Sequence, residues 1–150
     1  PDASVADRLI DRAQREDHPA HRRMALRSLI RIAPLPDERT NEARLELLKK
    51  AMQMCEQDAD RLAALERAKA VRIVETLRYL LPYLQQPKFA EQASLTIVEL
   101  AHHSGLREAH RSEFHEALDQ VIETSGDPVV IDRANHYKKG QTWVRPKSPR

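Results

Sequence analysis

A proline followed six residues later by an alanine recurs along this chain where helical stretches begin. The three pairs are Pro19 and Ala25, Pro87 and Ala93, and Pro128 and Ala134. The first two stretches also match further along, in the pairs Leu29 and Ile97, Ile30 and Val98, Ile32 and Leu100, and Ala33 and Ala101. Proline is tolerated in the first turn of a helix, and a small residue at a fixed site lets a neighbouring helix approach closely. The pattern predicts one helical unit that is repeated along the chain.

The spacing of the prolines predicts how many units there are. They lie 68 and 41 residues apart, and the longer gap fits two periods. A less regular copy that begins near Asp58 would fill this gap and would place Ala64 at the alanine site. The units then start 39, 29 and 41 residues apart, close to the spacing of about 30–45 residues seen in paired-helix repeats. We expect an all-α chain that forms an α/α superhelix, a solenoid of about four helix pairs. The alternative is an irregular helical bundle whose prolines fall at helix starts by chance.

Composition and apolar periodicity predict helix along most of the chain. Glycine occurs only 3 times, 41% of the residues are hydrophobic and 32% are charged, which indicates a folded rather than a disordered chain. The apolar period and the breaking residues predict eight helical segments: Ala3–Asp17, Pro19–Ala33, Asn41–Gln57, Asp60–Lys69, Ile73–Leu84, Pro87–His103, Glu108–Thr124 and Pro128–Lys139. The fourth and fifth segments could be one bent helix, and Pro82 predicts a kink or an early end in the fifth. Thr40 is the expected cap of the third segment.

Three segments carry a family resemblance. Asp127–Ala134 resembles the second helix of a HEAT repeat, in which Asp-Pro is followed by a branched residue, Arg and Ala. The stretch from Gln86 to Ala101 is similar to HEAT-like repeats of the phycobilisome-lyase type, which occur in many bacterial proteins, and the stretch from His21 to Ala33 fits the same scheme. The resemblance implies a HEAT/armadillo-like superhelix, often a segment of a larger multidomain protein, and it implies no catalytic residues. Asp58–Val71 departs from the pattern because no proline opens its helix.

Residues 2–139 form the expected HEAT-like domain, and residues 140–150 form the expected basic C-terminal tail. Residues 138–150 contain five basic residues and no acid, so the remaining body carries 20 basic and 23 acidic residues, a net charge of −3. Trp143 lies in this tail, and two interpretations are open: it folds back over the last helix pair, or it anchors a partner. We favour the first.

Arg23, Arg27 and Arg31 are spaced four apart, which aligns them along one side of the second helix, mostly opposite its apolar face. A phosphate or a carboxylate could bind there. Stacking would place Glu91 and Glu99 of the sixth segment alongside and make the face mixed in charge, so we favour a solvated or salt-bridged row of arginines over a basic binding track. Together with Trp143, these three arginines are the predicted interaction residues.

The sequence offers no recognisable catalytic, cofactor or metal site. No GxSxG motif and no glycine-rich phosphate loop occur. His110 and His115 are five residues apart, which turns them to different sides of a helix, and His102 and His103 diverge as neighbours. Cys55, the only cysteine, sits in an apolar setting typical of a buried residue. We therefore expect no enzyme, no cofactor and no metal.

A non-enzymatic protein–protein interaction or structural spacer module is the predicted function, with a protein partner or neighbouring domains of the same polypeptide as its targets. The first alternative is a nucleic-acid-binding helical repeat that uses the basic tail and the arginines. A lyase acting on a tetrapyrrole, suggested only by the name of the repeat family, is the least favoured reading. No apolar run reaches the roughly 18–20 residues of a membrane span, and no signal segment is visible. The chain starts at Pro1 rather than at a methionine, which indicates a processed chain or a piece of a longer one that could carry such a segment.

Overall fold

The computed structural model describes residues 3–146, and every regular element within that range is a helix. This confirms the all-α prediction for the described part of the chain. The chain divides into two compact units, with the boundary between Tyr79 and Leu80. No helix in the described range is both long and apolar enough to cross a bilayer.

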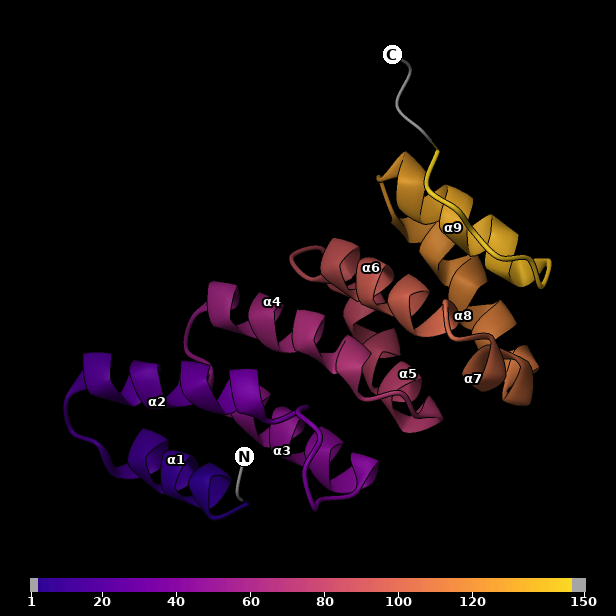
Figure 1. Cartoon of the computed structure of the whole chain (residues 1–150). Coiled ribbons are helices and arrows are strands. Elements are labelled where there is room, and N and C mark those ends of the chain that lie inside the picture. The colour runs from indigo at the N-terminus through magenta and orange to yellow at the C-terminus, as the bar shows by residue number, and fades with distance from the viewer. Residues whose placement is uncertain (1–2, 147–150) are drawn as a thin grey trace. The chain divides into compact units, whose positions relative to one another are not determined.

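The first unit contains two helical hairpins followed by a short helix (Figure 1). Its elements are α1 (Ala3–Arg15), α2 (Pro19–Ile32), α3 (Asn41–Met54), α4 (Asp58–Arg67), the 3-10 turn η1 (Ala68–Ala70) and α5 (Val74–Leu80), which ends at the unit boundary. Helix α1 packs on α2, and α3 packs on α4. In addition, α1 contacts α3 and α2 contacts α4. The second hairpin therefore stacks on the first, with equivalent helices side by side.

The second unit repeats this arrangement with different elements (Figure 1). It contains the 3-10 turn η2 (Leu81–Gln85), α6 (Ala90–Ala101), α7 (Ser104–Ala109), α8 (Arg111–Thr124) and α9 (Pro128–Lys138). The pairs η2 with α6 and α8 with α9 form the hairpins, and η2 contacts α8 while α6 contacts α9. The short α7 connects the hairpins and touches both α6 and α8.

Local signals in the sequence fix several helix ends. The Thr40 hydroxyl accepts a hydrogen bond from the Ala43 amide at 3.1 Å, which confirms the predicted cap of α3. The Asp127 carboxylate does the same for the Val129 amide at 2.8 Å, with Pro128 as the first residue of α9. Helix α9 ends at Lys138, and Gly140, with a φ of 70°, closes a Schellman motif in which the Gly140 amide donates to the Tyr137 carbonyl and the Gln141 amide donates to the His136 carbonyl. Beyond Gly140 the chain is irregular through residue 146, as predicted.

Six of the eight predicted segments are found with ends displaced by at most three residues. The fourth and fifth are separate helices because Val71 is extended, with φ −97° and ψ 90°, after η1. The predicted early end at Pro82 is confirmed, since α5 stops at Leu80 and η2 surrounds the proline. Helix α3 ends at Met54, three residues before the predicted Gln57.

Two predictions around α6 and α8 were wrong. Pro87 does not open α6, because it lies in a turn and the helix begins at Ala90. The segment predicted as a single helix from Glu108 is divided into α7 and α8 at His110, whose φ and ψ are −130° and 43°. Buried Arg107 explains this break, since its Nη1 donates to the Ala101 carbonyl at 2.5 Å and ties α7 to the end of α6.

The four alanine sites of the predicted repeat are all buried. Ala25 is 5% exposed, Ala64 is 2% exposed, and Ala93 and Ala134 are fully buried. They lie on α2, α4, α6 and α9, the second helices of the four hairpins. Large apolar side chains fill the remaining space in each unit, Leu29, Leu48 and Leu65 in the first and Ile97, Phe114 and Leu118 in the second. The small residues of the predicted repeat therefore lie in the interior of both units.

Ala64 provides a test of this packing in the least regular copy. We expect Ala64→Leu to lower the free energy of unfolding by about 1–3 kcal/mol, because the added side chain must displace close-packed neighbours. The matched control is Ala63→Leu, at an exposed site on the same helix, where the change should stay within about 0.5 kcal/mol. Urea denaturation followed by circular dichroism measures both variants. Equal stability of the two variants would contradict close helix packing at Ala64.

Candidate functional site

Helix α2 carries four arginines and no acidic residue: Arg22, Arg23, Arg27 and Arg31. A helix with this composition needs counter-charges from other elements or from a ligand, because like charges four residues apart repel each other. The neighbouring helix α4 and the loop before it supply some of these counter-charges. The surface that α2 and α4 share is the candidate functional site.

Asp60 of α4 is the main partner of this arginine row. Its side chain is only 4% exposed. Oδ2 accepts from Arg23 Nε at 2.7 Å and Oδ1 accepts from Arg27 Nε at 2.8 Å, with a longer 3.4 Å contact from Arg23 Nη2 to Oδ1. One buried carboxylate therefore joins α2 to α4 through two guanidinium groups.

The electrostatics of Asp60 favour the ionised carboxylate. Burial opposes ionisation of Asp60, but the hydrogen bonds and positive charges of Arg23 and Arg27 outweigh it and hold the pKa below its ordinary value. An ion pair in which the acid is buried and hydrogen-bonded on both oxygens is specific in geometry, and removing one partner leaves an uncompensated charge.

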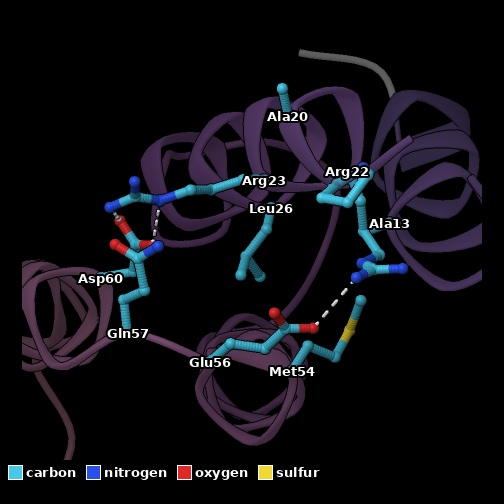
Figure 2. A pocket seen from close by; sticks show the side chains of 10 residues that line it. Ala13, Ala20, Arg22, Arg23, Leu26, Met54, Glu56, Gln57 and Asp60 are labelled. Atoms are coloured by element: carbon cyan, nitrogen blue, oxygen red, sulfur yellow. Dashed lines mark hydrogen bonds and ion pairs between the residues drawn. The ribbon is translucent and has the colours of Figure 1, made fainter. Parts of the chain in front are cut away.

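One side of this ion pair borders a cavity of about 240 Å³ (Figure 2). Arg22 and Glu56 face each other across it, with Arg22 Nη2 donating to Glu56 Oε1 at 3.3 Å. Gln57 comes from the segment that joins α3 to α4, Met54 is the last residue of α3, and Leu26 and Ala13 add apolar surface. The polar groups at its rim are engaged with one another, so the cavity has a mixed rather than a positive lining.

The other side of the ion pair borders a groove of about 310 Å³ between α2 and α4. Its polar rim contains Arg27, Arg31 and Arg67, and its acids are Asp60 and Glu66. Arg67 Nη2 donates to the Arg31 carbonyl at 2.7 Å, which holds Arg67 at the end of α2. Three guanidinium groups from two helices thus converge on one groove.

The arginine row is salt-bridged at Arg23 and Arg27, one of the two forms that the sequence left open, but the partners expected from the sixth segment were wrong. Arg23 and Arg27 pair with Asp60, not with Glu91 or Glu99. Glu91 instead accepts from Ser125 Oγ at 2.5 Å and from the Gly126 amide at 2.9 Å. Helix α2 therefore pairs with α4 of the next hairpin in the chain. This is the hairpin whose second helix has no opening proline.

In the second unit, Glu99 of α6 contacts the last helix through Arg133. Arg133 Nη1 donates to Glu99 Oε1 at 2.6 Å, and its Nη2 lies 3.4 Å from the hydroxyl of buried Tyr137. The Tyr137 hydroxyl also lies 3.0 Å from His102 Nδ1. Burial disfavours the charged form of Arg133, but the Glu99 and Tyr137 contacts outweigh it and raise the pKa of the guanidinium. This network links α6 to α9, as Asp60 links α2 to α4.

Trp143 lies back on α9, in agreement with the first of its two interpretations. Its indole Nε1 donates to Asp132 Oδ2 at 2.6 Å, and the Arg133 guanidinium sits 5.2 Å from the centre of its ring. The ring is half-buried. A cation–π contact of this kind, together with the hydrogen bond to Asp132, holds Trp143 on α9.

His102, His136 and Cys55 make contacts within the fold. His102 contacts Tyr137, and His136 Nδ1 lies 2.8 Å from the Asp132 carbonyl on its own helix. Among residues 3–146 no group of three or more His, Cys, Asp or Glu side chains is placed to hold a metal ion. Cys55 is 4% exposed, and burial, with the nearby Asp60 charge, raises the pKa of its thiol to about 11.

Asp60 and Arg67 are the residues of the site that the sequence interpretation missed. A signal for both was present, because they follow Arg23, Arg27 and Arg31 by 33 to 37 residues, about one repeat period. Residues one period apart on second helices lie next to each other in a stacked pair of hairpins. A search for opposite charges at that offset would have found Asp60.

Asp60 offers a stability test with a defined pH dependence. Because the folded-state pKa of Asp60 is lowered, its ion pairs stabilise the fold above the ordinary carboxyl pKa of about 3.9 and are lost as the pH falls through the folded-state value. We expect Asp60→Asn to lower the free energy of unfolding by about 1–3 kcal/mol at neutral pH, and the loss to shrink in acid.

Asp11→Asn is the control for this test, since Asp11 is 58% exposed and its pair with Arg15 lies within α1. An exposed pair contributes about 0–1 kcal/mol. Thermal or urea unfolding at neutral and acid pH compares the two variants with the parent chain. A loss in Asp60→Asn that is no larger than in Asp11→Asn, or that is the same at both pH values, would contradict the stabilising role of Asp60.

Cys55 should be nearly inert in the folded chain. At about pH 8 a thiol with a pKa near 11 is almost wholly protonated, and the thiolate is the reactive form. We expect slow reaction with an aromatic disulfide reagent until denaturant is added, followed by absorbance. A Cys55→Ala chain that also carries Ser112→Cys, at an exposed site of α8, should react without denaturant. Equally fast reaction of the native parent chain would contradict the burial of Cys55.

The chain gives no match to a protein-family model, to a curated protein or to a solved structure. The contacts and charges within each unit are therefore the basis for assigning a function.

Proposed function

We propose that this chain is a HEAT-like helical repeat of the phycobilisome-lyase type that serves as a non-enzymatic interaction or spacer module. In this proposal each hairpin stacks on the one before it, and about four helix pairs form an α/α superhelix. A protein partner, or neighbouring domains of a longer polypeptide, would bind to its surface. Stacked helical repeats offer extended surfaces to partners, and this is their common mode of action.

The observation that carries the proposal is the offset of the contacts between second helices. Arg23 and Arg27 reach Asp60 across 37 and 33 residues. In the other unit, Arg133 of α9 reaches Glu99 of α6 across 34 residues, and Ser125, in the turn before α9, reaches Glu91 of α6 across 34. Both units thus place equivalent helices side by side at close to one helical-repeat period of about 30–45 residues.

The state of the ionisable groups supports a binding rather than a catalytic role. A general acid or base works best with a pKa near the working pH. The Arg39 side chain lowers the pKa of Asp37, and Arg111 lowers that of Glu108. Asp60 is likewise held ionised, and the Cys55 thiol is held protonated. Guanidinium contacts lower the pKa of the three carboxyls and burial raises that of the thiol, so all four groups are shifted away from neutral pH.

A nucleic-acid-binding repeat is the second candidate, and the row of arginines on α2 favours it. Phosphate binding by a basic surface weakens steeply with salt. Against this candidate, the carboxylates Asp60 and Glu66 lie in the same groove as the arginines. Trp143, the aromatic residue of the basic tail, is engaged by Asp132 and Arg133 rather than presented for stacking on a base.

Selection from a displayed peptide library tests the interaction proposal without knowledge of the partner. We expect the full chain to enrich a family of related peptides, and a competing excess of free chain to release them. The same chain should bind a labelled random DNA duplex only weakly, with affinity lost between about 50 and about 200 mM salt. Failure to enrich any peptide family would contradict the peptide-binding form of the proposal, and tight duplex binding that resists salt would favour the nucleic-acid candidate.

A further inference from the structure

We propose that the groove between α2 and α4 binds an acidic segment of a protein partner, with its carboxylates received by Arg27, Arg31 and Arg67. This inference rests on the proposed interaction function and names the chemistry of the partner. The groove is lined by residues of these two helices alone, within the first unit.

The two helices carry an excess of positive charge. Helices α2 and α4 together contain six arginines and three carboxylates, whereas residues 1–137 as a whole carry a net charge of −3. A positive region on an acidic body attracts anions locally and steers them to one place. The excess distinguishes these two helices from the rest of the chain, and the groove between them keeps three of the arginines against two carboxylates.

The three carboxylates of these two helices, two of which line the groove, already have cationic partners. Asp58 accepts from Arg61 at 2.8 Å on the same helix. Asp60 binds Arg23 and Arg27, and Glu66 forms an ion pair with Lys69. Their negative charge is thus compensated, and the arginines that remain determine the character of the groove.

Donors remain on the three arginines of the rim. Arg31 is exposed, and its guanidinium makes no ion pair with any residue between 3 and 146. Arg67 uses Nη2 for the Arg31 carbonyl and its Nε is buried, so Nη1 is the nitrogen that it can offer to a ligand. Arg27 binds Asp60 through Nε only, and its side chain is 58% exposed. Guanidinium groups bind carboxylates through paired N–H donors, so these arginines can receive two or more carboxylates.

The base of the groove favours a peptide over a nucleic acid. Ile30, Ala59 and Ala63 line it alongside the arginines. Ala59 and Ala63 are exposed and lie one turn apart on α4, which offers a small apolar strip to a side chain. Carboxylates at Asp60 and Glu66 interrupt the positive surface, and a duplex with a phosphate charge every 1.7 Å or so would meet them. A short segment of mixed acidic and apolar residues matches both features.

Fluorescence anisotropy with a defined peptide pair tests the inference on the full chain. One labelled peptide alternates Glu or Asp with Leu, and its control has Gln or Asn in place of each acid. We expect the acidic peptide to bind at least about tenfold more tightly, because each charge-assisted hydrogen bond contributes strongly to affinity. Its affinity should fall as salt rises from about 50 to about 200 mM.

Two variants connect this binding to the groove. Arg31→Gln and Arg67→Gln should each weaken binding of the acidic peptide by about threefold to tenfold, and binding of the amide peptide should not change. Arg15→Gln is the matched control, since Arg15 is 81% exposed on α1 in the same unit, and it should leave the affinity unchanged. Circular dichroism checks the fold of each variant. If Arg67→Gln unfolds the chain, Arg31→Gln decides, because only the backbone of Arg31 takes part in a contact described for this unit.

Three results would overturn the inference. These are equal affinity for the two peptides, full acidic-peptide affinity in Arg31→Gln, and duplex binding that is tighter than peptide binding and is lost in Arg31→Gln. A library selection that enriches peptides without acidic residues, and that is unaffected by Arg31→Gln, would also overturn it while leaving the interaction proposal in place. Failure of the selection to enrich any peptide would count against the proposed function itself.

Discussion

Close contact between second helices is the constraint on which each unit depends. Helices of 10 to 14 residues are marginal in water on their own, so α2, α4, α6 and α9 are stable only when their apolar sides are covered. The buried alanines allow this approach, and one charged contact per pair then joins the polar edges. In the first unit the acid lies on the later helix and the bases on the earlier one, while Glu99 and Arg133 have the opposite order. Packing therefore sets where the helices meet, and either arrangement of charges can complete the contact.

The ion pair of α2 with Asp60 divides the arginines of α2 into two groups. Some stabilise the packing of α2 on α4, and others remain available to bind a ligand. Arg23 reaches Asp60 with a side chain that is 34% exposed, whereas the Arg27 side chain is 58% exposed and binds through one nitrogen. Arg31, one turn further, lies beyond the reach of Asp60 and borders the groove with Arg67. The degree of engagement decreases along the helix because a single acid lies opposite its first half.

Much of the fold could be predicted from the sequence, because apolar period, prolines and caps are local signals. Thr40, Pro128 and the alanine sites behaved as expected for this reason. The short helix α7 could not be predicted, because Arg107 fixes it through contacts with other helices. These contacts are with the Ala101 carbonyl of α6 and the Tyr137 ring of α9. For the site, the arginine row and Trp143 were identified but the partners of the arginines were not. Matching residues by similarity pointed to Glu91 and Glu99, whereas neighbours in a stack are set by chain order, which selects the irregular hairpin that contains Asp60.

That irregular hairpin is also where the candidate site lies, and the two facts are connected. Its second helix begins without a proline and carries Asp58, Asp60, Arg61, Glu66 and Arg67 in ten residues, so its polar side is more densely charged than that of α6. The sequence of this helix departs from the predicted pattern, but it contains Asp60, which binds α2, and Arg67, which lines the groove. Because Asp60 must stay buried and ionised to hold Arg23 and Arg27, it cannot also neutralise Arg31 and Arg67. The unpaired charge is thus a direct consequence of the contact that stabilises the unit, and a ligand with carboxylates is the complement that this arrangement leaves open.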